Sequence, residues 1–335
     1  GLTDKVWTLT RNELSMGLSP KQVTFGVKNG GCQLNATTGW TTSGVTLTAV
    51  TTAPYAGPHH FQGAAWSTND YISSAVDTAD QPAAKWQGQS ITVYAMVRDA
   101  SGAAGSMQMQ IVETGGGSTP TTSGTAVALS TTYQLISAAV TLQADSTGVE
   151  IRVTMSNDGG SDRTVYVDAV QALFGSVIPN ANNCRMKVQG TSLLCVTDRA
   201  VWKFNEDEDY WMLQEVHGQS ITGFEVFDNR AFVGQGESTA YEYSDANDPT
   251  VWTASTLAST AKNANYFVKA LNVNGDWTLG KTSDDDKFHL APDPTNTGSW
   301  GAALQVGKDD ATIIQVHDMG GTPAIAKEDG LYVYR

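Results

Sequence analysis

The chain has 335 residues, of which only 16% are charged, and its 34 acidic and 20 basic side chains give a formal net charge of −14 at pH 7. Thr, Ser, Gly and Ala are abundant, but the combined Glu, Lys, Leu and Ala richness of helical proteins is absent, which favours an all-β protein of two or three domains. The negative charge disfavours binding to nucleic acid or to an anionic membrane, and no run of about 18 apolar residues is present to insert into a bilayer. Neutral and cationic partners remain, and glycans are the obvious neutral class.

Residues 1–28 are predicted to be a lead-in that contains one strand. Residues 6–9 read Val-Trp-Thr-Leu, which is similar to the Val-Trp-Thr of residues 251–253. Because the second segment is expected to be an outer strand of a repeated β-element, we expect residues 6–9 to be a propeller strand placed upstream of another domain. Residues 29–178 would then be an insertion into a propeller.

Residues 29–178 are predicted to form a jelly-roll β-sandwich. Several short segments in this range alternate polar with apolar residues, as strands with one buried face do. Connectors rich in Gly, Ser, Thr and Asn separate them, which suits two packed antiparallel sheets. The predicted strands include residues 45–48, 91–97, 107–111, 134–136, 149–153 and 165–168.

A series of short motifs in this domain carries a family resemblance. Residues 29–33 read Asn-Gly-Gly-Cys-Gln, residues 38–40 read Thr-Gly-Trp, and residues 53–57 read Ala-Pro-Tyr-Ala-Gly. An extended strand follows at residues 91–98, and residues 165–170 close the domain with Val-Tyr-Val-Asp-Ala-Val. In this order and spacing, the motifs resemble the xylan- and glucan-binding jelly-roll carbohydrate-binding modules. The resemblance implies a jelly-roll fold and a glycan ligand.

The resemblance also implies which residues bind the sugar. Aromatic rings would stack on the apolar faces of sugar rings, while amide and charged side chains bond the hydroxyl groups. Trp66, Tyr71 and Trp86 are the predicted stacking residues, and Tyr133 is a further candidate. Trp40 is expected in the core, because the Gly-Trp position packs inside in this family. Core packing is the alternative for Trp66 and Trp86, and jelly rolls of this type also serve as structural spacers.

The same family often holds a structural calcium ion. An early Glu and the Asp of the last strand supply carboxylates there, and this chain has Gln33 and Asp168 at these positions. Gln offers only a neutral amide oxygen to a hard cation that prefers carboxylates. Asp168 is therefore the candidate metal ligand, calcium remains an open structural component, and no other cofactor is expected.

Residues 179–335 are predicted to be β-propeller blades. Four strand-like segments place bulky residues at alternate positions, and their aromatic members lie 39, 47 and 44 residues apart. A turn rich in Asp, Asn or Pro and then a tryptophan follow each of the first three segments, which is typical of a blade with an outer strand. The aromatic residues are Trp202, Tyr241, Phe288 and Tyr332, and the tryptophans are Trp211, Trp252 and Trp300.

The last predicted blade has no Trp-led strand after Tyr332. Either residues 6–9 complete it and close a ring of four blades, or the sequence is part of a longer protein with more blades. Four-bladed rings are at the small end of the known range, which favours the longer protein.

No constellation for catalysis or for metal chemistry is predicted in the propeller half. The acidic runs at residues 206–209 and 284–286 are typical of solvated turns. Neither a Gly-x-Ser-x-Gly elbow nor a phosphate-binding loop is present, and no histidine has metal-ligand spacing. The sequence therefore predicts no catalytic residues and no enzymatic activity, although a glycosidase needs only two carboxylates that folding brings together.

The favoured hypothesis is a non-enzymatic protein of a virion or cell surface, located outside the cell. The final repeat is similar to propeller repeats of bacteriophage tail and virion-surface proteins, and a carbohydrate-module insertion suits host recognition. The expected partners are a surface glycan and neighbouring structural subunits. Two alternatives are a polysaccharide-degrading hydrolase or lyase with a targeting module, and a purely architectural assembly protein.

Overall fold

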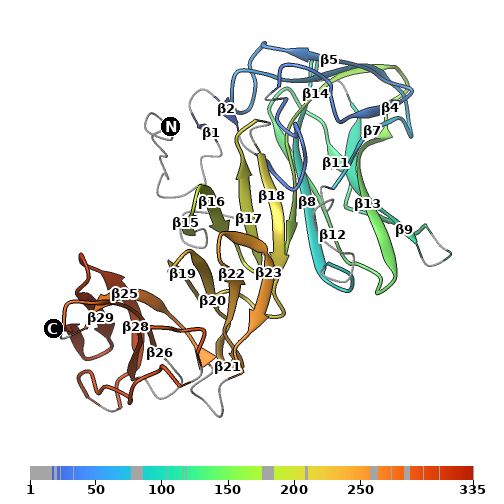
Figure 1. Ribbon diagram of the computed structural model, residues 1–335. Helices are drawn as coiled ribbons and strands as arrows, with labels where there is room; N and C mark the ends of the chain where they lie inside the picture. Colours follow the sequence, from blue (N-terminus) through green and yellow to red (C-terminus); the bar gives the residue numbers. More distant parts are fainter. Residues whose placement is uncertain are drawn as a thin grey trace. The chain divides into compact units, whose positions relative to one another are not determined.

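All regular structure in the described part of the chain is β-strand (Figure 1). None of the described segments is a helix of the length and hydropathy needed to cross a membrane. The predicted strand at residues 6–9 lies outside the described residues. The computed structural model describes residues 17–18, 21–22, 24–32, 34–76, 86–102, 104–115, 117, 119–175, 185–207, 210–256, 263–272, 274–282, 287–296, 298–308 and 310–334.

The chain divides into two compact units. The first comprises Gly1–Cys184 and Ala200–Val216, and the second comprises Arg185–Arg199 and His217–Arg335. Residues 200–216, which the sequence assigned to the propeller half, therefore group with the N-terminal unit. The expected boundary at residues 178 and 179 lies outside the described residues.

The first unit contains a jelly-roll β-sandwich of two antiparallel sheets, as predicted. We call them the front sheet and the back sheet. The front sheet has the order β10 (Thr121–Ser123), β9 (Ser106–Gly115), β13 (Ser146–Asn157), β7 (Tyr71–Ala75) and β4 (Thr41–Ser43), with β11 (Val127–Ala128) also paired to β9. The back sheet has the order β12 (Gln134–Thr141), β8 (Ser90–Asp99), β14 (Arg163–Phe174), β6 (His60–Trp66) and β5 (Thr46–Val50).

The core lies between these sheets and follows from the two-residue period of the strands. On β8, alternate residues point inward and are completely buried, and the same holds for β9. The residues between them point outward, so each sheet presents a second face to its surroundings. The inward residues on these strands are Ile91, Val93, Ala95, Val97, Met107, Met109 and Ile111.

A short strand of the lead-in extends the sheet that two later strands of this unit form. β3 (Thr24–Phe25) pairs in parallel with β18 (Tyr210–Val216), which pairs antiparallel with β17 (Ala200–Asn205). The Phe25 ring lies 5.3 Å from that of Trp202 and 5.6 Å from that of Trp211. Aromatic packing therefore explains why residues 200–216 belong with the N-terminal unit. A separate pair, β1 (Gly17–Leu18) and β2 (Lys21–Gln22), precedes β3.

The second unit is a series of antiparallel sheets whose strands follow one another along the chain. The predicted strands at Phe288 and Tyr332 are confirmed, whereas the strand expected around Tyr241 is interrupted at that residue. Trp252 lies on a following strand, as expected, but Trp300 lies in no strand; assembly of the sheets into a propeller stays a prediction. The strands are β15 (Arg185–Gln189) with β16 (Ser192–Val196); β19 (Gly223–Phe227), β20 (Arg230–Gly234), β22 (Glu242–Asp245) and β23 (Asp248–Ala254); β21 (Gly236–Ala240) with β24 (Asn263–Ala264); β25 (Phe267–Leu271), β26 (Trp277–Thr282) and β27 (Phe288–Ala291); and β28 (Ile313–Asp318), β29 (Pro323–Lys327) and β30 (Gly330–Val333).

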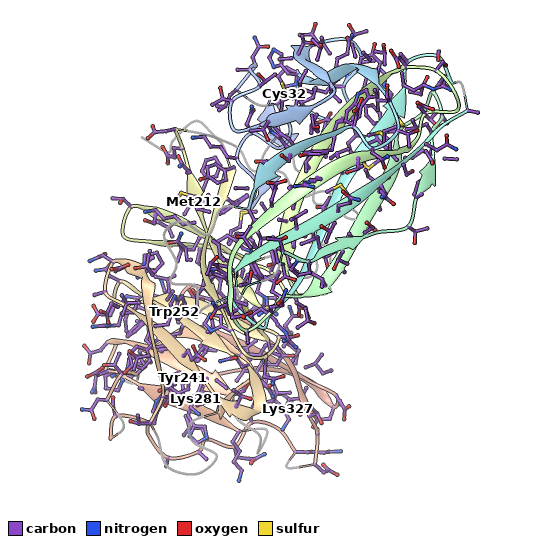
Figure 2. All side chains as sticks on the ribbon, turned by 90° about the vertical axis from the view of Figure 1, so that its right-hand side faces the viewer. Cys32, Met212, Tyr241, Trp252, Lys281 and Lys327 are labelled. Carbon is purple, nitrogen blue, oxygen red and sulfur yellow. The ribbon has the colours of Figure 1, made fainter. Side chains whose placement is uncertain are left out.

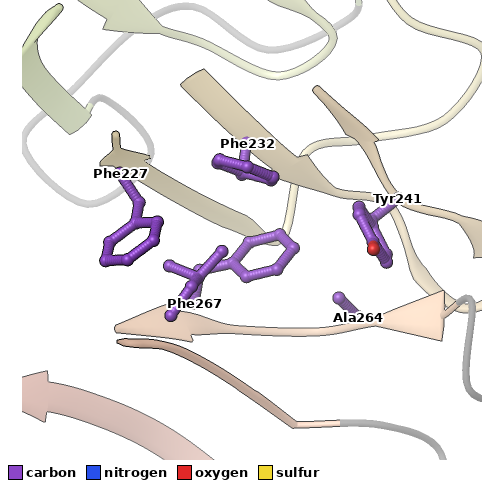
Figure 3. Packing of buried hydrophobic residues seen from close by; sticks show 6 residues of the cluster. Phe227, Phe232, Tyr241, Ala264 and Phe267 are labelled. Carbon is purple, nitrogen blue, oxygen red and sulfur yellow. The ribbon is translucent and has the colours of Figure 1, made fainter. Parts of the chain in front are cut away.

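The repeated aromatic residues of this unit pack inside it. Phe232, Tyr241 and Phe267 belong to one buried cluster (Figure 3). The Tyr241 hydroxyl donates to the Pro294 carbonyl over 2.7 Å and accepts from Trp300 Nε1 over 2.9 Å. Figure 2 labels Tyr241 beside the buried Lys281, whose Nζ lies 5.9 Å from the Tyr241 ring centre. The repeat pattern thus reflects packing and not a ligand site.

Close packing around β26 leads to a stability prediction. A Cβ at Gly280 would lie 2.2 Å from Cζ of Phe288, which is completely buried. We expect Gly280→Ala to lower the unfolding free energy by about 1–3 kcal/mol, because the ring has to shift within a packed core. At Gly218 a Cβ meets nothing within 4 Å. Gly218→Ala is the matched control, and denaturant unfolding should show a change below about 0.5 kcal/mol for it. Equal effects of the two substitutions would contradict this account.

Candidate functional site

The outward face of the front sheet brings together polar side chains from three strands. The register pairs Arg152 of β13 with Ser73 of β7 on one side and with Gln110 of β9 on the other. Thr154 pairs with Tyr71 in the same ladder. Since residues two apart on a strand share a face, these side chains all lie on the side opposite the core.

Tyr71 and Arg152 form the centre of this face. The Arg152 guanidinium carbon lies 4.3 Å from the centre of the Tyr71 ring, which is a cation–π contact. Arg152 Nε also donates to Glu150 Oε1 over 2.5 Å, and the two side chains are 26% and 37% exposed. The ion pair holds the guanidinium over the ring and neutralises its charge. The partly exposed ring is thereby fixed in one orientation.

Uncharged hydrogen-bonding groups surround this pair. Thr154 Oγ1 donates to Gln110 Oε1 over 3.0 Å, and Gln110 Nε2 donates to Ser123 Oγ over 3.1 Å. The hydroxyls of Thr41 and Ser73 are 2.7 Å apart. A half-exposed ring beside such amide and hydroxyl groups is the combination that recognises a sugar ring and its hydroxyls.

The structure is inconsistent with sugar stacking by Trp66 and Trp86. Trp66 is 0% and Trp86 is 1% exposed, so neither indole presents a face to a ligand. Trp66 lies against Gly63, where a Cβ would be 2.2 Å from the indole Nε1. Core packing, the alternative reading of both residues, agrees with this burial. Trp40 is 9% exposed, which agrees with its expected core position.

Asp168 is buried and its carboxylate is engaged by the backbone. Oδ2 accepts from the amides of Tyr55 and Ala56 over 2.9 and 3.1 Å, and Oδ1 accepts from the Ala169 amide over 2.7 Å. Burial raises the Asp168 pKa to about 7, against the lowering effect of these hydrogen bonds. The described residues contain no group of three or more His, Cys, Asp or Glu side chains arranged for a metal, and Gln33 lies outside them. Asp168 therefore anchors the loop that contains Tyr55 and Ala56, and its role as a calcium ligand stays a prediction.

The anchored loop covers the outward face of the back sheet. We call residues 51–59 the strap, which joins β5 to β6. Arg98 Nη2 donates to the carbonyl oxygens of Thr52 and Ala53 over 3.2 and 3.5 Å, so the strap is held by Arg98 as well as by Asp168. Tyr133, the further candidate ring, lies beside the strap, with its ring centre 5.5 Å from that of Tyr55.

His60 is completely buried at the end of the strap. Its ring lies 4.9 Å from the Tyr166 ring and 6.5 Å from the Tyr133 ring, both nearly perpendicular to it. Burial, with further contributions from Arg98 and His59, lowers the His60 pKa to about 4. The imidazole is therefore neutral at pH 7.

Sequence reasoning proposed Tyr71 as a stacking residue, which stays a prediction, and did not single out Arg152, Gln110, Arg98 or His60. The available signal was the strand period, because outward positions on the segments at residues 107–111 and 149–153 carry Gln, Glu and Arg. Their juxtaposition with Tyr71 depends on strand order, which one sequence does not specify.

The sequence matches no family model and no curated protein. Among solved structures, the CBM22-1 xylan-binding domain of Paenibacillus barcinonensis Xyn10C is similar over 47% of this chain and 99% of that domain, with 12% identity and a TM-score of 0.36. TmCBM61 in complex with β-1,4-galactotriose covers 45% of this chain and 99% of its own, with 12% identity and a TM-score of 0.34. The enzymatically active domain of bacteriophage CBA120 tailspike protein 4 covers 45% of this chain and 21% of its own, with 13% identity and a TM-score of 0.36.

Burial of His60 predicts a pH dependence of stability. A folded-state pKa of about 4 lies below the ordinary 6.5, so the unfolded chain binds more protons between these values. The contribution of His60 is therefore present above pH 6.5 and is lost as the pH falls to 4. We expect the unfolding free energy of the natural protein, relative to His60→Phe, to drop by about 3 kcal/mol over this range.

Denaturant unfolding of both proteins at pH 6.5 and pH 4 measures the difference. Asp168 has a raised pKa, so its contribution to the unfolding free energy falls as the pH rises towards 7. Both proteins contain Asp168, so subtracting one unfolding free energy from the other removes this effect. The other ionisable groups around the imidazole are His59, Arg98, Tyr133 and Tyr166. A pH-independent difference would contradict the assignment.

Proposed function

We propose that the protein is a non-enzymatic glycan-binding protein whose front sheet contacts the sugar. The observation that carries the proposal is the Tyr71 ring, partly exposed and held by Arg152 on a polar face where Glu150 balances the charge of Arg152. A sugar ring would pack its C–H face on the exposed part of the tyrosine, as aromatic residues in carbohydrate sites do. Its hydroxyls would bond the amide and hydroxyl groups of Gln110, Thr154 and Ser123.

The charge of this face favours a neutral glycan. Glu150 neutralises Arg152, and the chain as a whole carries a formal charge of −14, which repels polyanionic polysaccharides at low ionic strength. The same ion pair argues against hydrolysis at this face. A glycoside hydrolase uses two carboxylates in distinct roles, and Glu150 is already paired.

We infer that the second unit consists of propeller blades and that the protein works at a virion or cell surface beside other structural subunits. Successive antiparallel meanders with shared aromatic clusters support the blade interpretation. One cluster joins Phe232 to Phe267 of the next sheet, and another joins Phe288 to Ile325 of the sheet after that. A glycan-binding module on a virion or cell surface would be able to contact host glycans. Electron microscopy of the assembled particle or cell surface is the test of that location.

The glycan proposal predicts loss of binding on removal of one ring. In a glycan-array assay of the full chain, followed by calorimetry with the best-bound glycan, Tyr71→Ala should weaken binding at least about tenfold, or about 1.4 kcal/mol. Tyr71→Phe keeps the stacking ring and should retain most of the affinity. The control is Trp277→Ala, which removes a 51% exposed ring from the second unit.

Two results would count against the proposal. The first is that the folded full chain binds no glycan on the array, in which case the sandwich is a structural spacer. The second is that Tyr71→Ala leaves glycan binding unchanged, in which case the glycan binds another surface.

A further inference from the structure

Charged side chains are rare on the outward face of the front sheet. The ladders arrange its outward residues in rows that cross the strands, and residues 150, 152 and 154 of β13 each lie in one row. Within the described residues of these three rows, Glu150 and Arg152 are the only charged side chains. Their direct neighbours across the ladders are uncharged: Ser73 and Gln110 beside Arg152, and Ala75 and Val112 beside Glu150.

This single charge pair borders the stacking ring. The Arg152 guanidinium carbon lies 4.3 Å from the centre of the Tyr71 ring, and Arg152 Nε lies 2.5 Å from Glu150 Oε1. The Arg152 and Glu150 side chains are 26% and 37% exposed, so a ligand on this face has access to both. Because the guanidinium is in contact with the ring, the substituents of a sugar that stacks on Tyr71 come close to both charges.

The local pair outweighs the net charge of the chain in its effect on a bound sugar. The formal charge of −14 is spread over 335 residues, and physiological salt screens exposed charges over about 8 Å. Charges in direct contact with a ligand are screened much less, because little solvent lies between them. Glu150 and Arg152 therefore decide how this face responds to a charged sugar at physiological ionic strength.

The two members of the pair have opposite effects on an acidic sugar. A guanidinium by itself is a strong partner for a carboxylate, which it binds through two parallel N–H groups. Glu150 already supplies a carboxylate to Arg152, so a uronic acid would have to displace Glu150 or place a second negative charge beside it. Like charges at such short range repel, whereas the hydroxyls of a neutral sugar meet no such penalty.

We propose that Glu150 is the specificity-determining residue of the Tyr71 face and makes it reject sugars that carry a carboxylate while it accepts the matching neutral sugars. This inference rests on the proposed glycan binding at Tyr71, and it adds the class of glycan that is excluded and the residue that excludes it. Glu150 acts through Arg152, whose guanidinium it occupies and neutralises. Without the Glu150 carboxylate, the same guanidinium is an uncompensated cation beside the stacking ring, and it attracts a uronic acid.

Calorimetry of the full chain with matched probes tests this inference. The probes are the β-1,4-linked hexasaccharides of glucose, mannose and galactose, and the same three with each C6 hydroxymethyl group oxidised to a carboxylate. Glu150→Gln should bind at least one oxidised probe at least about tenfold more tightly than the natural protein does, and salt of about 1 M should reduce this gain. Glu150→Asp keeps a carboxylate and should still reject the oxidised probes. The control Glu206→Gln removes the same charge from an exposed turn and should show no gain.

Two double variants locate the gain. Glu150→Gln combined with Arg152→Gln, and Glu150→Gln combined with Tyr71→Ala, should both lose it, because the guanidinium attracts the carboxylate and the ring holds the sugar. The inference is overturned if folded Glu150→Gln gains affinity for none of the oxidised probes, if Glu206→Gln gains as much, or if the gain persists without the Tyr71 ring. Failure of the glycan proposal is distinguishable, because it shows in the natural protein and in Tyr71→Ala with neutral glycans, before any change at Glu150.

Discussion

The first unit depends on the burial of one side of every long strand. Residues such as Ile111 and Val153 are completely buried between the two sheets, and their neighbours along each strand have to point away from the core. Burial of this kind stabilises the sandwich by about 25 cal/mol for each Å² of apolar surface. A shift of strand register by one residue would turn the buried side chains outward and the outward side chains into the core. The same constraint therefore selects both the core and the outward side chains that are available to ligands.

The two outward faces use their side chains differently. On the open ladder of the front sheet, Arg152 lies over the Tyr71 ring and forms an ion pair with Glu150. Thr154 donates a hydrogen bond to Gln110 on the same face. On the back sheet, the strap covers the face, and Asp168 holds it down from beneath. The front-sheet face is therefore open to a ligand, whereas the strap covers the back-sheet face. The physical difference is whether the loop after β5 crosses the sheet.

In the second unit, aromatic repetition serves packing. Tyr241 and Trp300 are joined by a hydrogen bond, and Lys281 Nζ lies 5.1 Å from the Trp300 ring centre. Phe288 and Ile325 continue the packing into the last sheet. Residues that recur at a fixed spacing therefore mark equivalent positions in a stack of sheets, and their conspicuous size reflects the volume to be filled. Tyr71 differs from these residues because it is unrepeated and partly exposed, which makes it a candidate for ligand binding.

The sequence by itself determined the all-β class, many strand positions and the jelly-roll sandwich of the N-terminal part. These follow from local periodicity, which acts over a few residues. Only the tertiary structure decided the direction of each large side chain. Trp66 points into the core because Gly63 leaves room for the indole, although its position beside Tyr71 in the sequence made it an equally good binding residue. Asp168 accepts amides 112 and 113 residues away, and Arg152 reaches Tyr71 through a strand order that no local pattern contains. Contacts between distant strands depend on how the sheets pair, and pairing is a property of the whole folded chain.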